Sequence, residues 1–299
     1  KNFKKLIFHK KEAIILMHPF AYHEFKEIDV EENRSFVTKA IIKEGFVDLG
    51  IKKGDALFVH CSIKSFGFVC GGAQTIIESL METVGEEGTL VMPTQSWKNL
   101  DPSTGVHWEE PEAWWDLIRA NWPAYNKDVT PTNTMGAVAE IFRKWEGTER
   151  SNHPARSVAA WGKYSKFLIE NHDLSNIFGI DSPIHKFYNL DGKVLLLGVG
   201  YDKNTSLHLA DVLANYPSKK NCKESSAVFV NGKREWVTYE TLYVDGEDFE
   251  KIGQAFEEDK NNVSIKKIGD GEVRLMNQKQ LVDFAVKWIE KNRKLIGSD

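Results

Sequence analysis

The residues best suited to chemistry are a histidine and an aspartate three positions apart, His208 and Asp211. If the segment around them is helical, this spacing places both side chains on one helix face. An imidazole titrates near pH ~6.5, so it can act as a general base at neutral pH, and a neighbouring carboxylate can orient it. The plainer alternative is a half-exposed helix histidine that only hydrogen-bonds to its neighbour.

The residues before His208 predict a buried strand, a turn and a helix. A short apolar run begins at Val194 after the turn pair Asp191-Gly192 and is typical of a central strand covered on both faces. Gly198 ends the strand, and the polar residues 204–206 can accept hydrogen bonds from free amides at a helix start. We therefore expect the imidazole just beyond the carboxyl end of a buried strand, where open α/β sheets usually build their sites.

A second group of candidate residues is rich in hydrogen-bond donors. Arg150, Ser151 and Ser157 suit phosphate. Hydroxyls at a predicted helix entrance, where anions are favoured, come from Thr130, Thr132 and Thr134. Each residue has a structural explanation when taken singly, such as helix capping or an ion pair. Taken as a block, they favour phosphate binding.

A glycine-rich turn, residues 66–72, leads into a predicted helix over 73–84. Such a turn lets the backbone approach a ligand and can hold a phosphate on free amides. The signal is weak alone, because the full GxGxxG or Walker pattern is missing.

The connection over residues 95–128 is long and rich in aromatic and acidic residues. Long connections in compact domains are often functional. Carboxylates pair with ammonium groups and rings cover sugar faces, so Glu109, Glu110 and Asp116 suit a polycationic sugar substrate. A solvated insertion with a few tryptophans docked on the core explains the composition equally well.

Several motifs together resemble the aminoglycoside 3-N-acetyltransferase family. Residues 195–211 resemble its histidine motif LLLGVGxxxNTSLHLAE, with Asp211 in place of the final Glu. Residues 130–162 resemble TPTxMGxxxExFRxxPGxxRSxHPxxSxAAxG, with Glu146 in place of the usual Pro. Three shorter motifs also match. They are HSSL at residues 60–63, where Cys61 replaces a serine, the GWVxGG loop within residues 66–72, and the GxxSP turn at residues 179–183.

The resemblance implies an α/β fold of mixed β-sheets surrounded by helices, antibiotic N-acetyltransferase-like and unlike the GNAT fold. It implies an acetyl-CoA-dependent N-acetyltransferase that acetylates the 3-amino group of 2-deoxystreptamine aminoglycosides. We expect direct transfer with His208 as general base and Asp211 as its partner. Coenzyme A is expected at His60, Ser62, Gly71, Gly72, Thr130, Thr132, Met135, Arg150, Ser151, His153 and Ser157. Substrate is expected at Glu109, Glu110, Asp116 and Asp181.

Three other functions stay open at this point. One is acetylation of a different small amine by a member of the same family. Another is a cysteine amidohydrolase using Cys61 with a histidine, although a small residue filling a serine-sized space explains Cys61 better. The third is a coenzyme A-binding module without activity.

Composition limits the remaining possibilities. The 299 residues are 41% apolar and 27% charged, which is normal for a globular protein. A net charge of −4 does not indicate nucleic acid binding. Three cysteines without a CxxC unit favour a reducing compartment and no structural zinc, and no apolar run spans a bilayer. We expect a cytoplasmic enzyme with no metal, with a homodimer as an open possibility.

The chain is expected to form an N-terminal extension over 1–34 and a single α/β acetyltransferase domain over 35–299. Periodicity and turn signals predict helices over 35–43, 73–84, 137–144, 184–188, 249–256 and 278–292, with a further one inside 111–120. They predict strands over 56–59, 89–92, 158–161 and 273–276, and a hairpin around the turn Asn231-Gly232. Gly45 and the stretch over residues 50–54 are expected to end the first helix.

Overall fold

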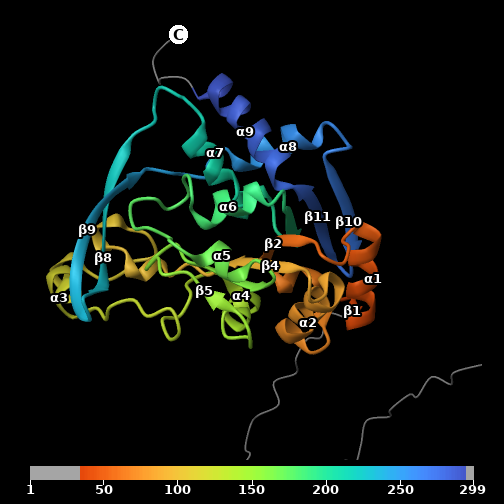
Figure 1. The fold of residues 1–299 in the computed structure, drawn as a ribbon, viewed down its shortest axis with the longest axis horizontal. Coiled ribbons are helices and arrows are strands. Elements are labelled where there is room, and N and C mark those ends of the chain that lie inside the picture. Colours follow the sequence, from red (N-terminus) through yellow and green to blue (C-terminus); the bar gives the residue numbers. More distant parts are fainter. Residues whose placement is uncertain (1–33, 294–299) are drawn as a thin grey trace, which may run out of the picture. The chain divides into compact units, whose positions relative to one another are not determined.

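A seven-stranded sheet lies at the centre of the computed structural model, which describes residues 34–293 (Figure 1). Its strands, in spatial order, are β10 (Val263–Ile268), β11 (Gly271–Asn277), β7 (Lys193–Leu197), β2 (Ala56–Cys61), β4 (Thr89–Pro93), β6 (Val158–Gly162) and β5 (Glu149–Arg150). The central strands β7, β2 and β4 run parallel, and the outer strands pair antiparallel. The predicted mixed α/β architecture is confirmed.

Alternating side chains of the central strands enter two hydrophobic clusters, one on each face of the sheet. In β7, Val194 and Leu196 belong to one cluster, and Leu195 and Leu197 belong to the other. The predicted strand covered on both faces is therefore confirmed. Helices on the first face are α5 (Ser165–Ile169), α6 (Pro183–Asn189), α7 (Leu207–Leu213), α8 (Phe249–Glu257) and α9 (Gln278–Asn292). Helices on the second face are α1 (Lys39–Leu49), α2 (Gly72–Val84) and α4 (Gly136–Phe142).

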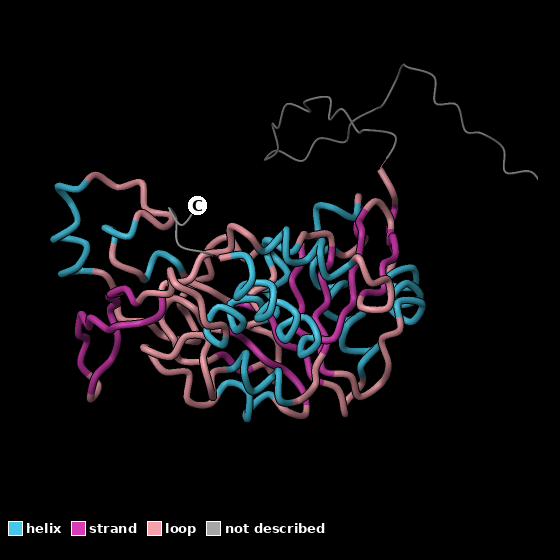
Figure 2. The backbone as a smooth tube through the Cα atoms, turned by 90° about the horizontal axis from the view of Figure 1, so that it is seen from above, coloured by secondary structure: helices cyan, strands magenta, loops and turns pink. Residues whose placement is uncertain are grey.

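A long β-hairpin stands apart from the strands of the large sheet (Figure 2). It consists of β8 (Asn221–Val230) and β9 (Lys233–Leu242), joined by the predicted Asn-Gly turn. The acidic, aromatic connection lies along it: the Asp101 amide donates to the Ser225 carbonyl at 3.0 Å. This connection contains the short helices η2 (Trp97–Asn99), η3 (Pro102–Thr104), η4 (Glu112–Trp114) and α3 (Trp115–Asn121).

Short elements connect the sheet to the layers around it. Two one-turn helices, η1 (Ile63–Phe66) and η5 (Tyr201–Lys203), follow β2 and β7. The two-residue strands β1 (Phe36–Val37) and β3 (Phe68–Val69) pair in parallel.

One expectation about local structure is wrong in part, and one strand was missed. Helix α1 continues through Gly45 and ends at Gly50, which has a φ of 102°. A Cβ at Gly45 would lie 2.5 Å from Cδ1 of Ile268, so this glycine permits close packing on β10 and does not end the helix. Strand β10 was not expected, because four of its six residues are exposed and its apolar alternation is weak.

The extension expected over residues 1–34 lies outside the described residues, apart from Arg34, and stays a prediction. None of the helices between residues 34 and 293 has the length and apolar content needed to cross a membrane.

Candidate functional site

The carboxyl ends of β2 and β7 meet at one edge of the large sheet. The Ser62 amide donates to the Leu197 carbonyl at 2.9 Å, and the Ser65 hydroxyl donates to the Gly198 carbonyl at 2.8 Å. Gly198 has a φ of 64°, and a Cβ there would lie 2.6 Å from Cβ of Ser65. Only glycine therefore fits this point, where the chain leaves β7 toward α7.

His208 and Asp211 form a hydrogen-bonded pair on α7, as their spacing predicts. Nδ1 of His208 lies 3.1 Å from Oδ2 of Asp211. Asp211 is 0% exposed, while the His208 side chain keeps 18% exposure. Because an ionised carboxylate only accepts, Nδ1 carries the proton in this bond and Nε2 has a lone pair. Among the described residues no group hydrogen-bonds to Nε2, so this lone pair is available to a substrate.

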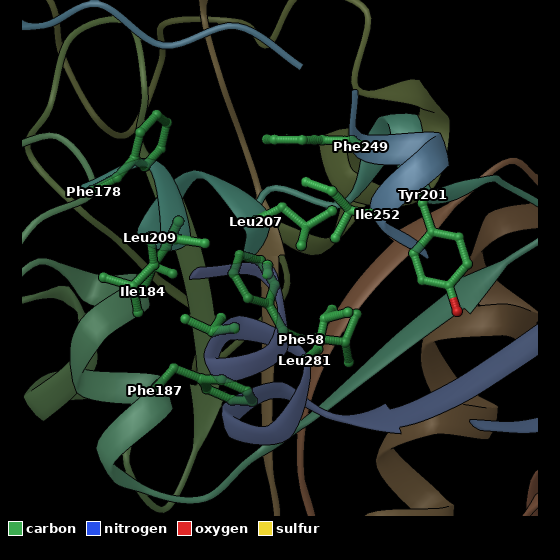
Figure 3. Close-up of a cluster of buried hydrophobic side chains, with 14 of the residues drawn as sticks. Phe58, Phe178, Ile184, Phe187, Tyr201, Leu207, Leu209, Phe249, Ile252 and Leu281 are labelled. Atoms are coloured by element: carbon green, nitrogen blue, oxygen red, sulfur yellow. The ribbon is translucent and has the colours of Figure 1, made fainter. Parts of the chain in front are cut away.

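Two phenyl rings fix the plane of the His208 imidazole. Phe178 stacks on it with centroids 4.7 Å apart and planes 10° apart, and Phe249 contacts it at 4.8 Å and 59°. Figure 3 shows both phenyl rings at one end of the cluster that also holds Leu207 and Leu209. The ring is therefore held by packing as well as by Asp211.

The second oxygen of Asp211 binds an arginine that the sequence did not indicate. Nη1 of Arg293, just after α9, lies 2.6 Å from Oδ1 of Asp211. The same guanidinium donates Nε and Nη2 to the two oxygens of Asp248, both at 2.7 Å. A separation of 82 residues hides the contact between Arg293 and Asp211 from any local pattern.

A pocket of about 260 Å³ is connected to the histidine through Phe178, and His208 itself is not among its lining residues. Its lining includes Phe178, which stacks on His208, and Val212, which follows Asp211. The remaining lining comes from the loop before α6 and from the open end of the hairpin: Ser175, Asn176, Ile177, Gly179, Asn221, Glu240, Thr241, Leu242 and Val244. Glu240 is the one carboxylate in this lining, and sequence reasoning missed it because its strand matched no motif.

The carboxylates expected to bind substrate lie in two places. Asp181 follows the lining residue Gly179 by two positions and is exposed, with a φ of 67°. Glu109 is exposed in the connection, whereas Glu110 pairs with Lys98 at 2.9 Å and Asp116 pairs with Arg119 at 2.8 Å.

The connection runs toward the turn end of the hairpin, where Nε of Arg234 donates to the Trp122 carbonyl at 3.1 Å. The pocket lies at the other, open end, next to Asn221. A substrate role for Glu109, Glu110 and Asp116 stays a prediction, and their placement separates them from the pocket.

The glycine-rich turn enters α2 without a capping side chain. Gly71 and Gly72 have φ values of 83° and 61°, and nothing lies within 4 Å of a Cβ built on Gly72. The free amides of this helix start form a donor set suited to a phosphate. Helix α4 begins beside the end of β2, because a Cβ on Gly136 would lie 3.7 Å from the carbonyl oxygen of Cys61.

The remaining candidates for coenzyme A are partly exposed. Ser62 follows β2 and accepts from the Ser65 hydroxyl at 3.2 Å, and Met135 precedes α4. Thr130 accepts from the Asn126 amide at 3.0 Å, and the Thr132 hydroxyl donates to Glu140 at 2.9 Å. Their binding roles stay predictions.

Arg150 has a structural role in this fold, and its predicted phosphate contact stays a prediction. It is 3% exposed, and all three of its nitrogens donate to protein oxygens. The acceptors are the hydroxyls of Thr94, Ser96 and Ser157 and the carbonyls of Thr94, Lys127 and Thr130. A phosphate would have to displace these bonds, so we assign Arg150 to holding β4, β5 and the connection together.

Four more of the expected cofactor residues are buried, and their contact with a ligand stays a prediction. Ser151, His153 and Ser157 are 0% exposed and His60 is 4% exposed. Ser151 hydrogen-bonds to Nδ1 of His172 at 2.9 Å, and His153 Nδ1 accepts from the Arg156 amide at 3.0 Å. These motif residues therefore take part in a buried hydrogen-bond network.

No side chain between residues 34 and 293 hydrogen-bonds to the thiol of Cys61 to activate it. Burial raises the pKa of its thiol to about 12, and a thiol without a thiolate fraction is a poor nucleophile. The neighbouring His60 stacks on Phe58 in the first cluster, whereas Cys61 packs against the second. The amidohydrolase alternative therefore has no support in the geometry.

The mixed sheet with helices on both faces and a histidine–aspartate pair at its carboxyl edge fits the class of acetyltransferase that the sequence motifs indicate. The model of the family described as aminoglycoside 3-N-acetyltransferase matches residues 58–290, and the chain belongs to this family. The predicted family and enzyme class are confirmed.

Two relatives and two solved structures show how far this similarity extends. The SPbeta prophage-derived aminoglycoside N(3')-acetyltransferase-like protein YokD of Bacillus subtilis (strain 168) is 41% identical over 85% of this chain and 93% of its own length. Aminoglycoside N(3)-acetyltransferase IX of Micromonospora chalcea is 34% identical over 86% of this chain and 95% of its own. The YokD crystal structure matches with a TM-score of 0.83 over 88% of this chain and 97% of that chain. The AAC-IIIb binary structure with CoASH matches with a TM-score of 0.77 and 26% identity, over 88% of this chain and 100% of that chain.

Proposed function

We propose that the chain transfers an acetyl group from acetyl-CoA to the 3-amino group of a 2-deoxystreptamine aminoglycoside. The observation that carries this proposal is the His208–Asp211 pair, held at 3.1 Å beyond the carboxyl end of β7 with Nε2 free. Family membership supplies the reaction class, and the pair supplies the base that the reaction needs.

His208 acts as the general base in direct transfer. Its Nε2 takes a proton from the substrate ammonium, and the freed amine attacks the acetyl carbonyl carbon. The new C–N bond forms as the thioester C–S bond breaks, and the thiolate leaves with the bonding electrons. The second N–H proton of the amine passes to the departing sulfur, which gives the free thiol of coenzyme A. Positioned general bases contribute roughly 10²–10⁴-fold in rate.

The start of α2 is the proposed site for a phosphate of coenzyme A. The amides after Gly71 are uncapped, and the space beside Gly72 is open. Both features fit an anion that approaches the backbone closely. The solved CoASH complex of AAC-IIIb supports the choice of this acyl donor.

The pocket beside Phe178 is the proposed site for part of the amine substrate. Glu240 supplies one carboxylate for an ammonium group, and Asp181 lies close by in sequence to the lining loop. Acidic groups in this place suit a substrate with several ammonium groups.

A thiol-release assay with acetyl-CoA and a panel of amines tests the proposal. The panel contains 2-deoxystreptamine aminoglycosides, their 3-N-acetylated forms and simple diamines. We expect release only with free 3-amino groups. Release with simple amines but no aminoglycoside would keep the family chemistry and reject the substrate, and the absence of release with every amine would reject the function.

A further inference from the structure

The His208–Asp211 pair is the inner part of a longer chain of charged groups. Asp211 binds Arg293 through Oδ1 at 2.6 Å, and Arg293 binds Asp248 at 2.7 Å through both Nε and Nη2. The side chains come from α7, from the end of α9 and from the residue that precedes α8. Three elements far apart in sequence therefore converge behind the imidazole.

Arg293 limits how the Asp211 carboxylate can be oriented. A buried carboxylate must have its oxygens satisfied, and Asp211 is 0% exposed. Since Arg293 binds Oδ1, Oδ2 is the oxygen that faces Nδ1 of His208. That arrangement fixes the proton on Nδ1 and leaves Nε2 as the basic nitrogen.

Asp248 connects the guanidinium to the packing of the ring. Its bidentate contact fixes the plane of the Arg293 guanidinium, as fork-to-carboxylate pairs do. The next residue, Phe249, contacts the His208 ring at 4.8 Å. The same turn of chain therefore orients both the carboxylate and the imidazole.

We propose that Arg293 and Asp248 are positioning residues for His208, acting through Asp211. Asp248 holds the guanidinium, and the guanidinium holds Asp211 so that His208 presents Nε2 to the substrate. This inference rests on the proposed function for its role in turnover, but the positioning itself can be measured without turnover.

The electrostatic consequence has a definite sign. The positive charge of Arg293 opposes the effect of the Asp211 carboxylate on His208, and Asp248 opposes Arg293. Other charged or titratable groups near Asp211 and Arg293 are Lys219, whose amine binds the Ala214 carbonyl at 2.9 Å, Tyr216 beneath the guanidinium at 5.1 Å, and Asp245. Removing Arg293 should therefore favour the charged imidazolium, and removing Asp248 should disfavour it.

The test combines NMR titration of the His208 ring with steady-state kinetics. The variants are Arg293→Gln, Asp248→Asn and Arg293→Lys. Arg293→Lys keeps the positive charge but cannot make the two-point contact with Asp248. Arg274→Gln is the matched control, because Arg274 also pairs with a carboxylate, Glu257 at 2.6 Å, and also lies over a tyrosine ring, Tyr201 at 5.8 Å. The His208 signal is assigned by its loss in His208→Gln.

We expect Arg293→Gln to raise the midpoint of the His208 titration by about one pH unit and Asp248→Asn to lower it. Arg293→Gln should also lower kcat about 10²-fold while KM stays within about twofold, since a misplaced catalytic group costs this order. Arg293→Lys should keep the titration midpoint near that of the unmodified protein and still lower kcat, and Arg274→Gln should change neither quantity.

The inference would be overturned by equal losses of kcat in Arg293→Gln and Arg274→Gln. It would also be overturned if the His208 ring titrated with the same midpoint pH in all variants. If Arg293→Gln does not fold, Asp248→Asn and Arg293→Lys decide it by the same two readouts. If the unmodified protein releases no thiol with any amine, the proposed function fails, and the titration still judges the positioning.

Discussion

Oδ2 of Asp211 reaches Nδ1 of His208 at 3.1 Å, although the family motif carries a longer glutamate at this position. The shorter side chain is sufficient because both residues lie on one face of α7, three positions apart. Arg293 on the other oxygen fixes the carboxylate in this geometry. The pair is therefore complete without the extra methylene group.

The glycine turn before α2 gives the most direct test of the phosphate site. Gly72→Ala should weaken coenzyme A binding about tenfold, because its Cβ enters the open space where the phosphate is proposed and its φ is 61°. Gly232→Ala is the matched control, since Gly232 has a φ of 76°, also has nothing within 4 Å, and lies at the hairpin turn. Each change should cost about 1 kcal/mol of stability through backbone strain. Calorimetry should show a larger coenzyme A dissociation constant for Gly72→Ala and an unchanged one for Gly232→Ala. Equal dissociation constants for the two variants would reject the site.

The pocket carboxylate should govern affinity for a cationic substrate. Glu240→Gln is expected to raise the aminoglycoside dissociation constant about fivefold at low salt, with the difference fading as ionic strength rises. Glu235→Gln removes the same charge from the same strand, toward the turn end, and should have little effect. Titration calorimetry at two salt concentrations measures both. Indistinguishable constants for the two variants would show that Glu240 does not contact the substrate.

His60 should contribute to acid sensitivity and not to cofactor binding. Burial lowers its pKa to about 3, while the unfolded chain has an ordinary value near ~6.5. Between these values the unfolded state binds more protons, so stability falls as pH drops from about 6.5 to about 3. Nε2 of His60 is buried and has no hydrogen-bond partner among the described residues, so His60→Leu removes no hydrogen bond at this atom.

For His60→Leu we expect acid unfolding at a lower pH, near-unchanged stability at pH ~7 and an unchanged coenzyme A constant. Circular dichroism against pH and calorimetry measure these quantities. An unchanged midpoint of acid unfolding together with weakened coenzyme A binding would contradict this prediction and support a contact between His60 and coenzyme A.

The sequence predicted the strands and helices that carry the pair, because strong apolar runs and local turn chemistry set them. β2, β4, β7 and α7 all follow this rule. It could not indicate that Arg150 and Ser157 donate to the buried Thr94 carbonyl, because a donor-rich motif has the same pattern whether its donors face a ligand or a buried carbonyl.

The residues that complete the site could not be found from local patterns. Arg293 meets Asp211 only through the packing of α9 on α7, and Glu240 reaches the pocket only through the path of the hairpin. Both contacts depend on tertiary arrangement, which spacing along the chain does not encode.

The kinetic effect of removing His208 tests the central claim most directly. His208→Ala should lower kcat by roughly 10²–10⁴-fold, because the amine loses its proton acceptor, and should leave coenzyme A binding nearly intact. Asp211→Asn should cost less, since it acts on the base indirectly. The measurement is thiol release under saturating acetyl-CoA and aminoglycoside, with folding checked by thermal unfolding. The account predicts a folded His208→Ala protein with that loss of kcat, and a folded His208→Ala protein that acetylates at nearly the unmodified kcat would contradict it.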